Sequence, residues 1–384
     1  MKDHTQRAVA YIVGRLATGK YSSSLHDFSV SKDFTFEGSV SPATVSIFDY
    51  QKRCKITGSG DSGSFTLLHH GNYRELILNF EAEKNRFSGY DEDSKTNYSG
   101  TVDGGSISVY DYEHSKLFTY SLYIMGRDQL NFTYIGGPTA LLEFSGLRLL
   151  TDPTFDPAGE EYPTPWYTLR KTAAPALSSE SLGRIDAVLL SHDHHFDNLD
   201  HRGRAFLKNA GMVLTTQAGA KRLGGHAVGL APWQGVDLPT PDGRVLRVTG
   251  TPARHGPVDG DRGPVIGFVL ALTESPERAI YISGDTVWYE GVAEVSQCFS
   301  VRIAILFMGA ARVLEVGTAH LTFTAEGAVE AARVFVDAAI IPLHYEGWMH
   351  FSESRKEIED AFISAGLERR LQWTEPGRAN AITI

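Results

Sequence analysis

The 384-residue sequence contains only two cysteines, Cys54 and Cys298. Two cysteines cannot build a disulfide framework, and this pair has no zinc-ribbon spacing, so a reducing compartment such as the cytoplasm is the simpler expectation. The sequence also has no run of about 18 apolar residues, which excludes an ordinary transmembrane helix. Its first apolar stretch is short and interrupted, and we expect no signal peptide there.

Runs of Lys and Arg are also missing, and the formal net charge is -10. Proteins that bind nucleic acids usually carry a basic stripe, so this class of partner is not expected. With 42% hydrophobic and 21% charged residues, the composition is that of an ordinary globular protein. A small-molecule substrate is therefore the expected partner.

Residues 1–130 and 131–384 differ in pattern and predict two domains. The first part alternates polar and apolar residues in short runs such as "TVSIFDY" and "SISVYDY", separated by turn signals such as "GSGDSG". This pattern predicts antiparallel strands in a β-sandwich or barrel. Residues 38–50 also match residues 100–112 without a gap, which indicates a duplicated hairpin.

The beginning of the first part predicts an amphipathic helix. Apolar side chains recur there at helical spacing, at Val9, Ile12, Val13 and Leu16. His69 and His70 are neighbours in a strand-like run and point to opposite faces, so we interpret them as surface or packing residues rather than as metal ligands. This otherwise all-β part is expected to mediate interactions, to form a homo-oligomer or to cover an active site.

The second part has the alternating strands and helices of an α/β fold, and polar clusters follow its apolar strands. The most crowded cluster is "SHDHHFDNLD", at residues 191–200. The candidate metal ligands are His192, His194, His195, Asp197, His255, Asp285 and His344. Imidazoles and carboxylates in this number suit one or two divalent ions, zinc foremost, with iron or manganese as alternatives.

The order of these residues resembles the metallo-β-lactamase superfamily throughout residues 131–384: H-x-H and Asp, a later His, a strand followed by "GD", and a strand followed by His. The segment "TALLEFSGLRLLTDP" is similar to the opening hairpin of that family and carries Asp152 in its last turn. The resemblance implies a four-layer αββα fold. It further implies that His192, His194 and His255 hold a first metal, that Asp285 bridges two metals, and that Asp197 and His344 hold the second.

This chain departs from the usual H-x-H-x-D-H motif of the family. One extra residue precedes Asp197, and Asn198 stands where the last His is expected. His195 either replaces that missing ligand or orients another ligand from outside the coordination shell.

The closing segment, "HLTFTAEGAV" through "IIPLHYEGWMHF", resembles the branch that contains ascorbate-phosphate lactonases and the phospholipase D acting on N-acyl phosphatidylethanolamines. By that resemblance His320 is a catalytic residue on the substrate side, placed before a helix whose predicted N-cap is Thr324. Tyr345, Glu346, Trp348 and His350 are expected to line the pocket.

The expected function is metal-dependent hydrolysis, by a metal-bound hydroxide, of an ester, lactone, amide or phosphodiester in a small to medium organic molecule. Asp197 would orient the nucleophile or accept a proton. Esters and lactones rank above phosphodiesters because only Arg254 and Arg312 offer a phosphate clamp. Asn198 and the inserted residue keep a second hypothesis open, a non-catalytic or regulatory binding module with a degenerate site. A third is an iron-dependent redox enzyme on the same ligands.

Overall fold

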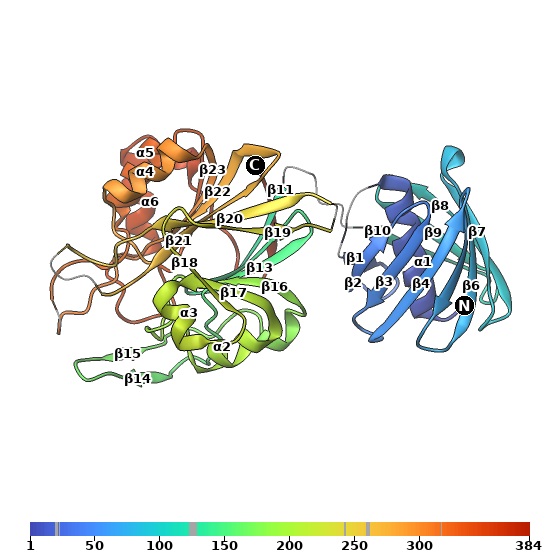
Figure 1. Ribbon diagram of the computed structural model, residues 1–384, viewed down its shortest axis with the longest axis horizontal. Helices are drawn as coiled ribbons and strands as arrows, with labels where there is room; N and C mark the ends of the chain where they lie inside the picture. The colour runs from blue at the N-terminus through green and yellow to red at the C-terminus, as the bar shows by residue number, and fades with distance from the viewer. Residues whose placement is uncertain (20–21, 23, 123–128, 242, 259–261, 316) are drawn as a thin grey trace. The chain divides into compact units, whose positions relative to one another are not determined.

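The computed structural model describes residues 1–19, 22, 24–122, 129–241, 243–258, 262–315 and 317–384. The chain forms two compact units, Met1–Arg127 and Asp128–Ile384 (Figure 1). Within the described residues, no helix combines the length and apolar character needed to cross a membrane.

The first unit is a closed barrel of antiparallel strands. Consecutive strands pair with each other, and β1 closes the barrel against β10, with Leu25 opposite Leu122. The strands are β1 (Ser24–Asp27), β2 (Lys32–Val40), β3 (Thr44–Asp49), β4 (Cys54–Asp61), β5 (Ser64–His69), β6 (Arg74–Glu81), β7 (Arg86–Asp91), β8 (Thr96–Asp103), β9 (Ser106–Asp111) and β10 (Lys116–Leu122). Closure leaves no sheet edge unpaired.

Helix α1 (Asp3–Thr18) lies inside this barrel (Figure 1). Residues 8–13 are completely buried and share one hydrophobic cluster with the inward side chains of the strands. The predicted helix is confirmed, but part of its polar side is buried too: Thr5, Gln6 and Arg15 are buried, whereas Asp3 is exposed. Two polar side chains of the helix reach carboxylates of the barrel: Gln6 donates to Asp111 at 2.7 Å, and Arg7 donates to Asp27 at 2.8 Å.

Turns at one set of strand ends explain the sequence repeat. Buried aspartates end β1, β3, β7 and β9, and each accepts the backbone N–H of the residue two positions later; they are Asp27, Asp49, Asp91 and Asp111. His69 stands at the matching end of β5, where its Nδ1 accepts the N–H of Gly71 at 3.2 Å. His69 is therefore buried as a turn residue, and His70 contacts the Thr57 hydroxyl at 2.8 Å.

The second unit contains two large sheets and a small hairpin. The seven-stranded sheet has the order β18-β17-β16-β13-β12-β11-β25. Its strands are β11 (Gln129–Gly136), β12 (Thr139–Phe144), β13 (Leu147–Thr151), β16 (Ile185–Leu189), β17 (Ala210–Thr216), β18 (Ala227–Leu230) and β25 (Ala379–Thr383). The hairpin consists of β14 (Glu161–Pro163) and β15 (Thr168–Arg170).

The six-stranded sheet has the order β19-β20-β21-β22-β23-β24. Its strands are β19 (Gly235–Pro239), β20 (Val245–Pro252), β21 (Ile266–Leu272), β22 (Ser275–Ile282), β23 (Val301–Phe307) and β24 (Ala339–Leu343). The helices of this unit are α2 (His201–Phe206), α3 (Gln217–Leu223), α4 (Glu290–Cys298), α5 (Ala325–Val334) and α6 (Arg355–Ser364).

The cores of the second unit follow the sheets. One hydrophobic cluster combines side chains from both large sheets, and a second joins the six-stranded sheet to α4, α5 and α6, which lie together in Figure 1. Every residue of β21 is buried, as expected for a strand that is covered on both faces.

The predicted opening hairpin is confirmed as β12 and β13, joined by Ser145 and Gly146, whose φ angles of 51° and 82° match a tight hairpin turn. The predicted N-cap of α5 is also confirmed, because the Thr324 hydroxyl accepts the N–H of Gly327 at 3.0 Å.

Candidate metal centre

Four strands of the second unit deliver candidate ligands just beyond their carboxyl ends. His192 follows β16, His255 follows β20, Asp285 follows β22, and His344 follows β24. All four side chains are buried. Irregular chain after a strand can turn a side chain toward its neighbours, so the ends of separate strands can supply one site.

Three imidazole nitrogens converge at the centre. His195 Nδ1 lies 2.9 Å from His192 Nε2 and 3.2 Å from His255 Nε2. Asp285 Oδ2 lies 3.6 Å from His255 Nε2. These four residues form what we call the first donor group.

Hydrogen bonds on the far sides of the rings fix which nitrogen carries the proton. The Ser191 hydroxyl donates to Asp152, so its oxygen is left to accept from His192 Nδ1 at 2.9 Å. His255 Nδ1 lies 2.7 Å from the carbonyl oxygen of Leu321, which can only accept. Both Nε2 atoms therefore present lone pairs to the centre. A proton on His195 Nδ1 can be donated to only one of these two Nε2 atoms at a time. A metal ion at the centre can instead accept the lone pairs of all three nitrogens, including that of His195 Nδ1.

The electrostatics of the first donor group agree with neutral rings. Burial, followed by the neighbouring imidazoles, holds the pKa of His192 well below its ordinary value. Burial and then His255 lower the pKa of His195 to about 3. Neutral imidazole is the form that binds divalent metals.

Three further residues form a second donor group: Asp197, His344 and His350. His344 Nε2 and His350 Nε2 lie 3.7 Å and 3.0 Å from the same oxygen, Asp197 Oδ2. Burial opposes ionisation of Asp197, but the hydrogen bond from His350 and the charges of the imidazoles outweigh it and lower the pKa of Asp197. This carboxylate is therefore ionised and ready to hold a cation.

Asp285 joins the two donor groups. Its Oδ1 lies 2.9 Å from His344 Nδ1, while its Oδ2 faces His255. Asp285 Oδ2 and His344 Nε2 are buried and have no hydrogen-bond partner among the described residues. Buried polar atoms nearly always have a hydrogen-bond partner. Two buried atoms without one, both of a type that binds metals, are what is expected where a cation binds.

His194 lies at the rim of this cluster. It is exposed, and its Nε2 lies 2.9 Å from the carbonyl oxygen of Arg262. Its ring centroid is 4.8 Å from that of His192 and 4.4 Å from that of His195. The Arg262 carbonyl can only accept, so His194 Nδ1 is left with a lone pair. The ligand atoms of His192, His194 and His195 all lie within 4.8 Å of one another, so His194 stays a candidate ligand beside His195.

Asn198 occupies a supporting position. Its amide Nδ2 donates to Asp152 Oδ2 at 3.0 Å, and its Oδ1 is buried without a partner among the described residues. Asp152 also accepts the N–H of Ser191 at 2.6 Å. Burial raises the pKa of Asp152 to about 7, against the lowering effect of these hydrogen bonds. Asp152 thus braces the segment that carries His192.

A second buried carboxylate, Asp200, was not assigned a role from the sequence. Its oxygens accept the N–H groups of Phe155 and Asp156 at 2.9 Å and 2.7 Å, and that of Gly203 at the start of α2. Lys171 donates to it at 2.8 Å in a buried ion pair. The only sequence feature that pointed to Asp200 was its place at the end of the "DNLD" segment. Its partner Lys171 is too distant in sequence for a local pattern to reveal the ion pair.

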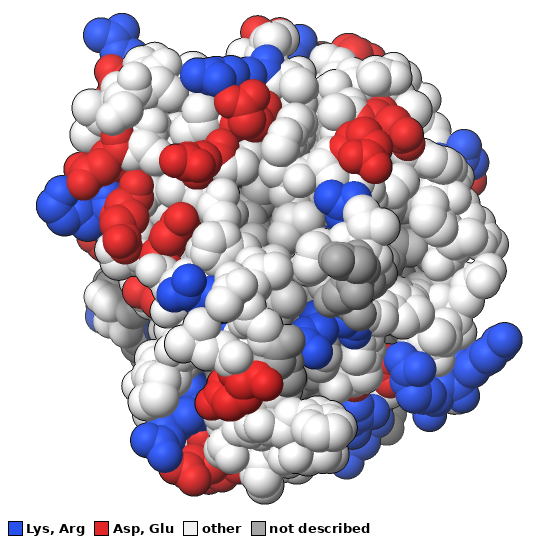
Figure 2. Space-filling model, turned by 90° about the vertical axis from the view of Figure 1, so that its left-hand side faces the viewer, with Lys and Arg blue, Asp and Glu red and all other residues white. Residues whose placement is uncertain are grey.

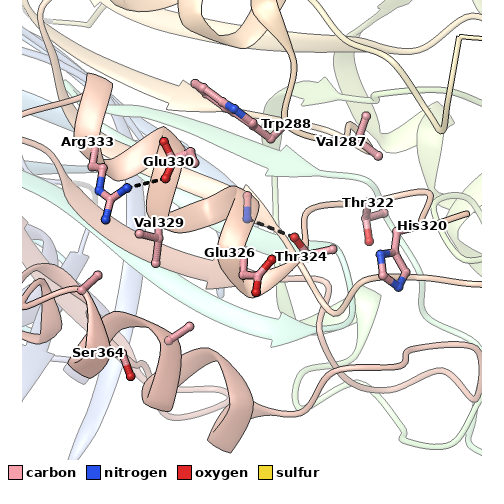
Figure 3. A pocket seen from close by; sticks show the side chains of 13 residues that line it. Val287, Trp288, His320, Thr322, Thr324, Glu326, Val329, Glu330, Arg333 and Ser364 are labelled. Atoms are coloured by element: carbon pink, nitrogen blue, oxygen red, sulfur yellow. Dashed lines mark hydrogen bonds and ion pairs between the residues drawn. The ribbon is translucent and has the colours of Figure 1, made fainter.

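His320 lines an open pocket of about 820 Å³ beside α5. Figure 3 shows His320 and Thr322 at one end of this pocket and Arg333 and Glu330 at the other. The intervening Leu321 is the residue whose carbonyl accepts from His255. The segment of residues 320–322 therefore forms part of the pocket wall and also contacts the first donor group. None of the described residues that line the pocket belongs to either donor group.

Comparisons with known proteins show which family the chain belongs to. The family model described as "Beta-lactamase superfamily domain" matches residues 147–345, more than half of the chain. The chain belongs to the beta-lactamase superfamily. The matched range contains every residue of the two donor groups except His350.

One relative is the UPF0173 protein YddR of Bacillus subtilis (strain 168), 24% identical over 258 residues, which are 65% of this chain and 99% of YddR. An isothiocyanate hydrolase from Delia radicum gut bacteria shares the fold with a TM-score of 0.55 and 23% identity, over 66% of this chain and 99% of that protein. CmlA, a diiron β-hydroxylase from Streptomyces venezuelae, has a TM-score of 0.50 and 14% identity, over 69% of this chain and 55% of CmlA. YddR is covered almost completely by two thirds of this chain, so it has no room for a second unit of the barrel's size.

Proposed function

We propose that this protein is a metal-dependent hydrolase that binds two divalent cations and cleaves an ester or lactone in a small to medium organic substrate. The observation that carries the proposal is the convergence of lone-pair nitrogens and carboxylate oxygens in the two donor groups. Several curated relatives carry the name metal-dependent hydrolase, which supports the same activity class.

The donor spacing fits metal ligands. Around a tetrahedral zinc ion with bonds near 2.1 Å, neighbouring ligand atoms are about 3.4 Å apart. The donor contacts given above range from 2.9 Å to 3.7 Å and bracket that value. His192, His195 and His255 would hold the first cation, Asp285 would bridge, and Asp197 and His344 would hold the second. Zinc suits this set best, with iron and manganese as alternatives.

A bound divalent cation supplies a lowered pKa for a coordinated water and polarises the electrophilic oxygen of the substrate. The chain supplies the remaining functions. The ionised Asp197 orients the nucleophile and accepts its proton, and the buried Asp152 holds Ser191 and thereby the tautomer of His192. His320 donates to the substrate from the pocket wall.

Arginine contacts support an ester or lactone over a phosphodiester. The Arg254 guanidinium lies over the ring of Tyr289, 4.3 Å from its centroid, and within 3.8 Å of Glu290. These two contacts hold the guanidinium on its ring side and at one terminal nitrogen, while its buried Nε has no partner among the described residues. Figure 2 shows positive and negative side chains intermixed on the face of the molecule that it draws, which suits a small organic substrate better than a polyanion.

We further propose that the second unit is layered αββα. The hydrophobic cluster between the two sheets and the cluster under α4, α5 and α6 support three of these layers. The cluster that joins α2 to the outer face of the seven-stranded sheet supports the fourth.

The proposal is tested by metal analysis together with a panel of chromogenic esters, lactones, amides and phosphodiesters. Purified protein should contain between about one and two equivalents of divalent metal and should lose turnover on chelation and regain it on metal addition. A fully loaded protein that cleaves none of the four classes would favour the binding-module hypothesis.

An iron-dependent redox enzyme is the second candidate, because the same ligands suit iron and because CmlA, which is similar in fold over 55% of its length, is described as a diiron β-hydroxylase. Iron as the principal metal after growth in balanced medium, with a visible absorption band, would favour it. Zinc as the principal metal, with turnover on esters, would exclude it.

A further inference from the structure

The second donor group contains an imidazole that the family motif does not account for. His350 lies beyond the segment matched by the family model, in the chain that follows β24. Its Nε2 lies 3.0 Å from Asp197 Oδ2, the oxygen that also faces His344 Nε2. His350 therefore shares the carboxylate proposed to bind the second cation.

Asn198, which stands in the motif position, is occupied elsewhere. Its amide nitrogen donates to Asp152 Oδ2 at 3.0 Å. Only Asn198 Oδ1 remains without a partner among the described residues, and a neutral amide oxygen is a poor ligand for zinc compared with imidazole. The second site thus lacks an imidazole from the motif.

The segment around His350 is held in place by backbone hydrogen bonds on both sides. The carbonyl of His350 accepts the N–H of Arg312 at 2.9 Å, and Met349 N–H donates to the carbonyl of Arg170 at 3.0 Å. The neighbouring Phe351 packs against the rings of His350 and His344, with centroid distances of 4.7 Å and 5.0 Å. The ring position is therefore fixed before any ligand binds, as a metal site requires.

We propose that His350 Nε2 is a ligand of the second cation and replaces the imidazole that Asn198 cannot supply; this inference rests on the metal centre of the proposed function. The second cation is then held by Asp197, His344 and His350, with Asp285 shared between both cations. The separations of 3.0 Å and 3.7 Å at Asp197 Oδ2 fit neighbouring ligand atoms around one ion. The competing role is that His350 only donates a hydrogen bond that positions Asp197.

The test measures metal binding rather than turnover. Chelated full-length protein is titrated with cobalt(II), followed by calorimetry and visible absorption, in wild type, His350→Ala and His350→Gln. We expect about two equivalents in wild type and about one in both variants, with weaker absorption from the second-site ion. His201→Ala is the matched control, because this exposed imidazole lies outside both donor groups, and it should bind as wild type does.

Two further arms separate the alternatives. Asn198→Ala should keep the second equivalent if His350 is the ligand, and should lose it if the Asn198 oxygen is. Cadmium-113 bound to protein with nitrogen-15 histidine should show scalar coupling to His350 Nε2, which a positioning residue cannot show. Two tight equivalents in both His350 variants, or no coupling to His350, would overturn the inference. Absence of any metal binding in wild type would instead overturn the proposed function itself.

Discussion

At the scale of single residues, the two adjacent imidazoles His194 and His195 have different surroundings. His195 Nδ1 contacts two other ring nitrogens, whereas His194 is exposed and contacts the Arg262 carbonyl. We therefore expect His195→Ala to lose most of the first metal equivalent, because a three-histidine site cannot easily spare one ligand. His194→Ala should keep its metal. Mass-spectrometric metal analysis of the two variants checks this, and the reverse pattern would make His194 the ligand in place of His195.

His320 provides a second contrast at this scale. It lines the pocket beside α5 and lies next to Leu321, but it contributes no atom to either donor group. We expect His320→Ala to lower kcat by about 10²-fold, as the loss of a proton donor does, while its metal content equals that of wild type. Loss of metal from this variant would show a structural role, and unchanged turnover on the true substrate would remove His320 from the mechanism.

At the residue scale, the sequence could place a candidate ligand only where a recognisable element precedes it. His255, Asp285 and His344 could be named because each follows an apolar strand whose end is recognisable. The choice between His194 and His195 depends on how one extra residue before Asp197 is absorbed in an irregular turn, which no periodicity encodes. His350 was expected only to line the pocket, because its approach to Asp197 depends on backbone contacts of residues 345–353 with distant strands and loops.

At the scale of elements, the strands and helices of the second unit were predictable because apolar runs between turn signals are local features. Helix α1 shows the limit of that approach. An apolar stripe is equally present in a helix on a surface and in one inside a barrel; what distinguishes them here is that Gln6 and Arg7 find buried carboxylates on β9 and β1. Those partners lie too far along the chain for a sequence pattern to reveal them.

The packing of α1 against β5 predicts a pH dependence for the first unit. The rings of His4 and His69 lie 5.0 Å apart, with Lys2, Lys52 and Asp93 as charged neighbours of His4. Burial, and then His69, lower the pKa of His4 to about 4, and burial lowers the pKa of His69 from its ordinary value of 6.5. Between about pH 6.5 and 4 the unfolded chain therefore binds more protons than the folded one, so stability falls as the pH falls through this window.

His4→Gln should reduce this dependence, because the variant removes one of the two groups that resist protonation. Calorimetric unfolding at pH 7 and at pH 4.5 measures it: the downward shift in the transition of the first unit should be smaller in His4→Gln than in wild type. Equal shifts in the two proteins would contradict the assignment to His4.

At the scale of the whole molecule, the two units have separate hydrophobic cores. The cluster of the first unit is made of α1 and the barrel strands, and among the described residues the clusters of the second unit draw only on the second unit. YddR is matched over 99% of its length by 65% of this chain, so it corresponds to only part of this two-unit protein. We therefore expect damage to one core to leave the other unit folded.

Ile12→Ala tests this expectation. Ile12 is completely buried at the centre of α1, and truncating such a side chain costs about 2–5 kcal/mol because a cavity remains. The unfolding transition of the barrel should move to lower temperature, and this shift identifies which calorimetric transition belongs to the barrel. The metal content and the other transition should stay as in wild type, since every residue of the two donor groups belongs to the second unit. Loss of metal in Ile12→Ala would instead show that the barrel supports the metal centre, and would make the first unit part of the catalytic apparatus.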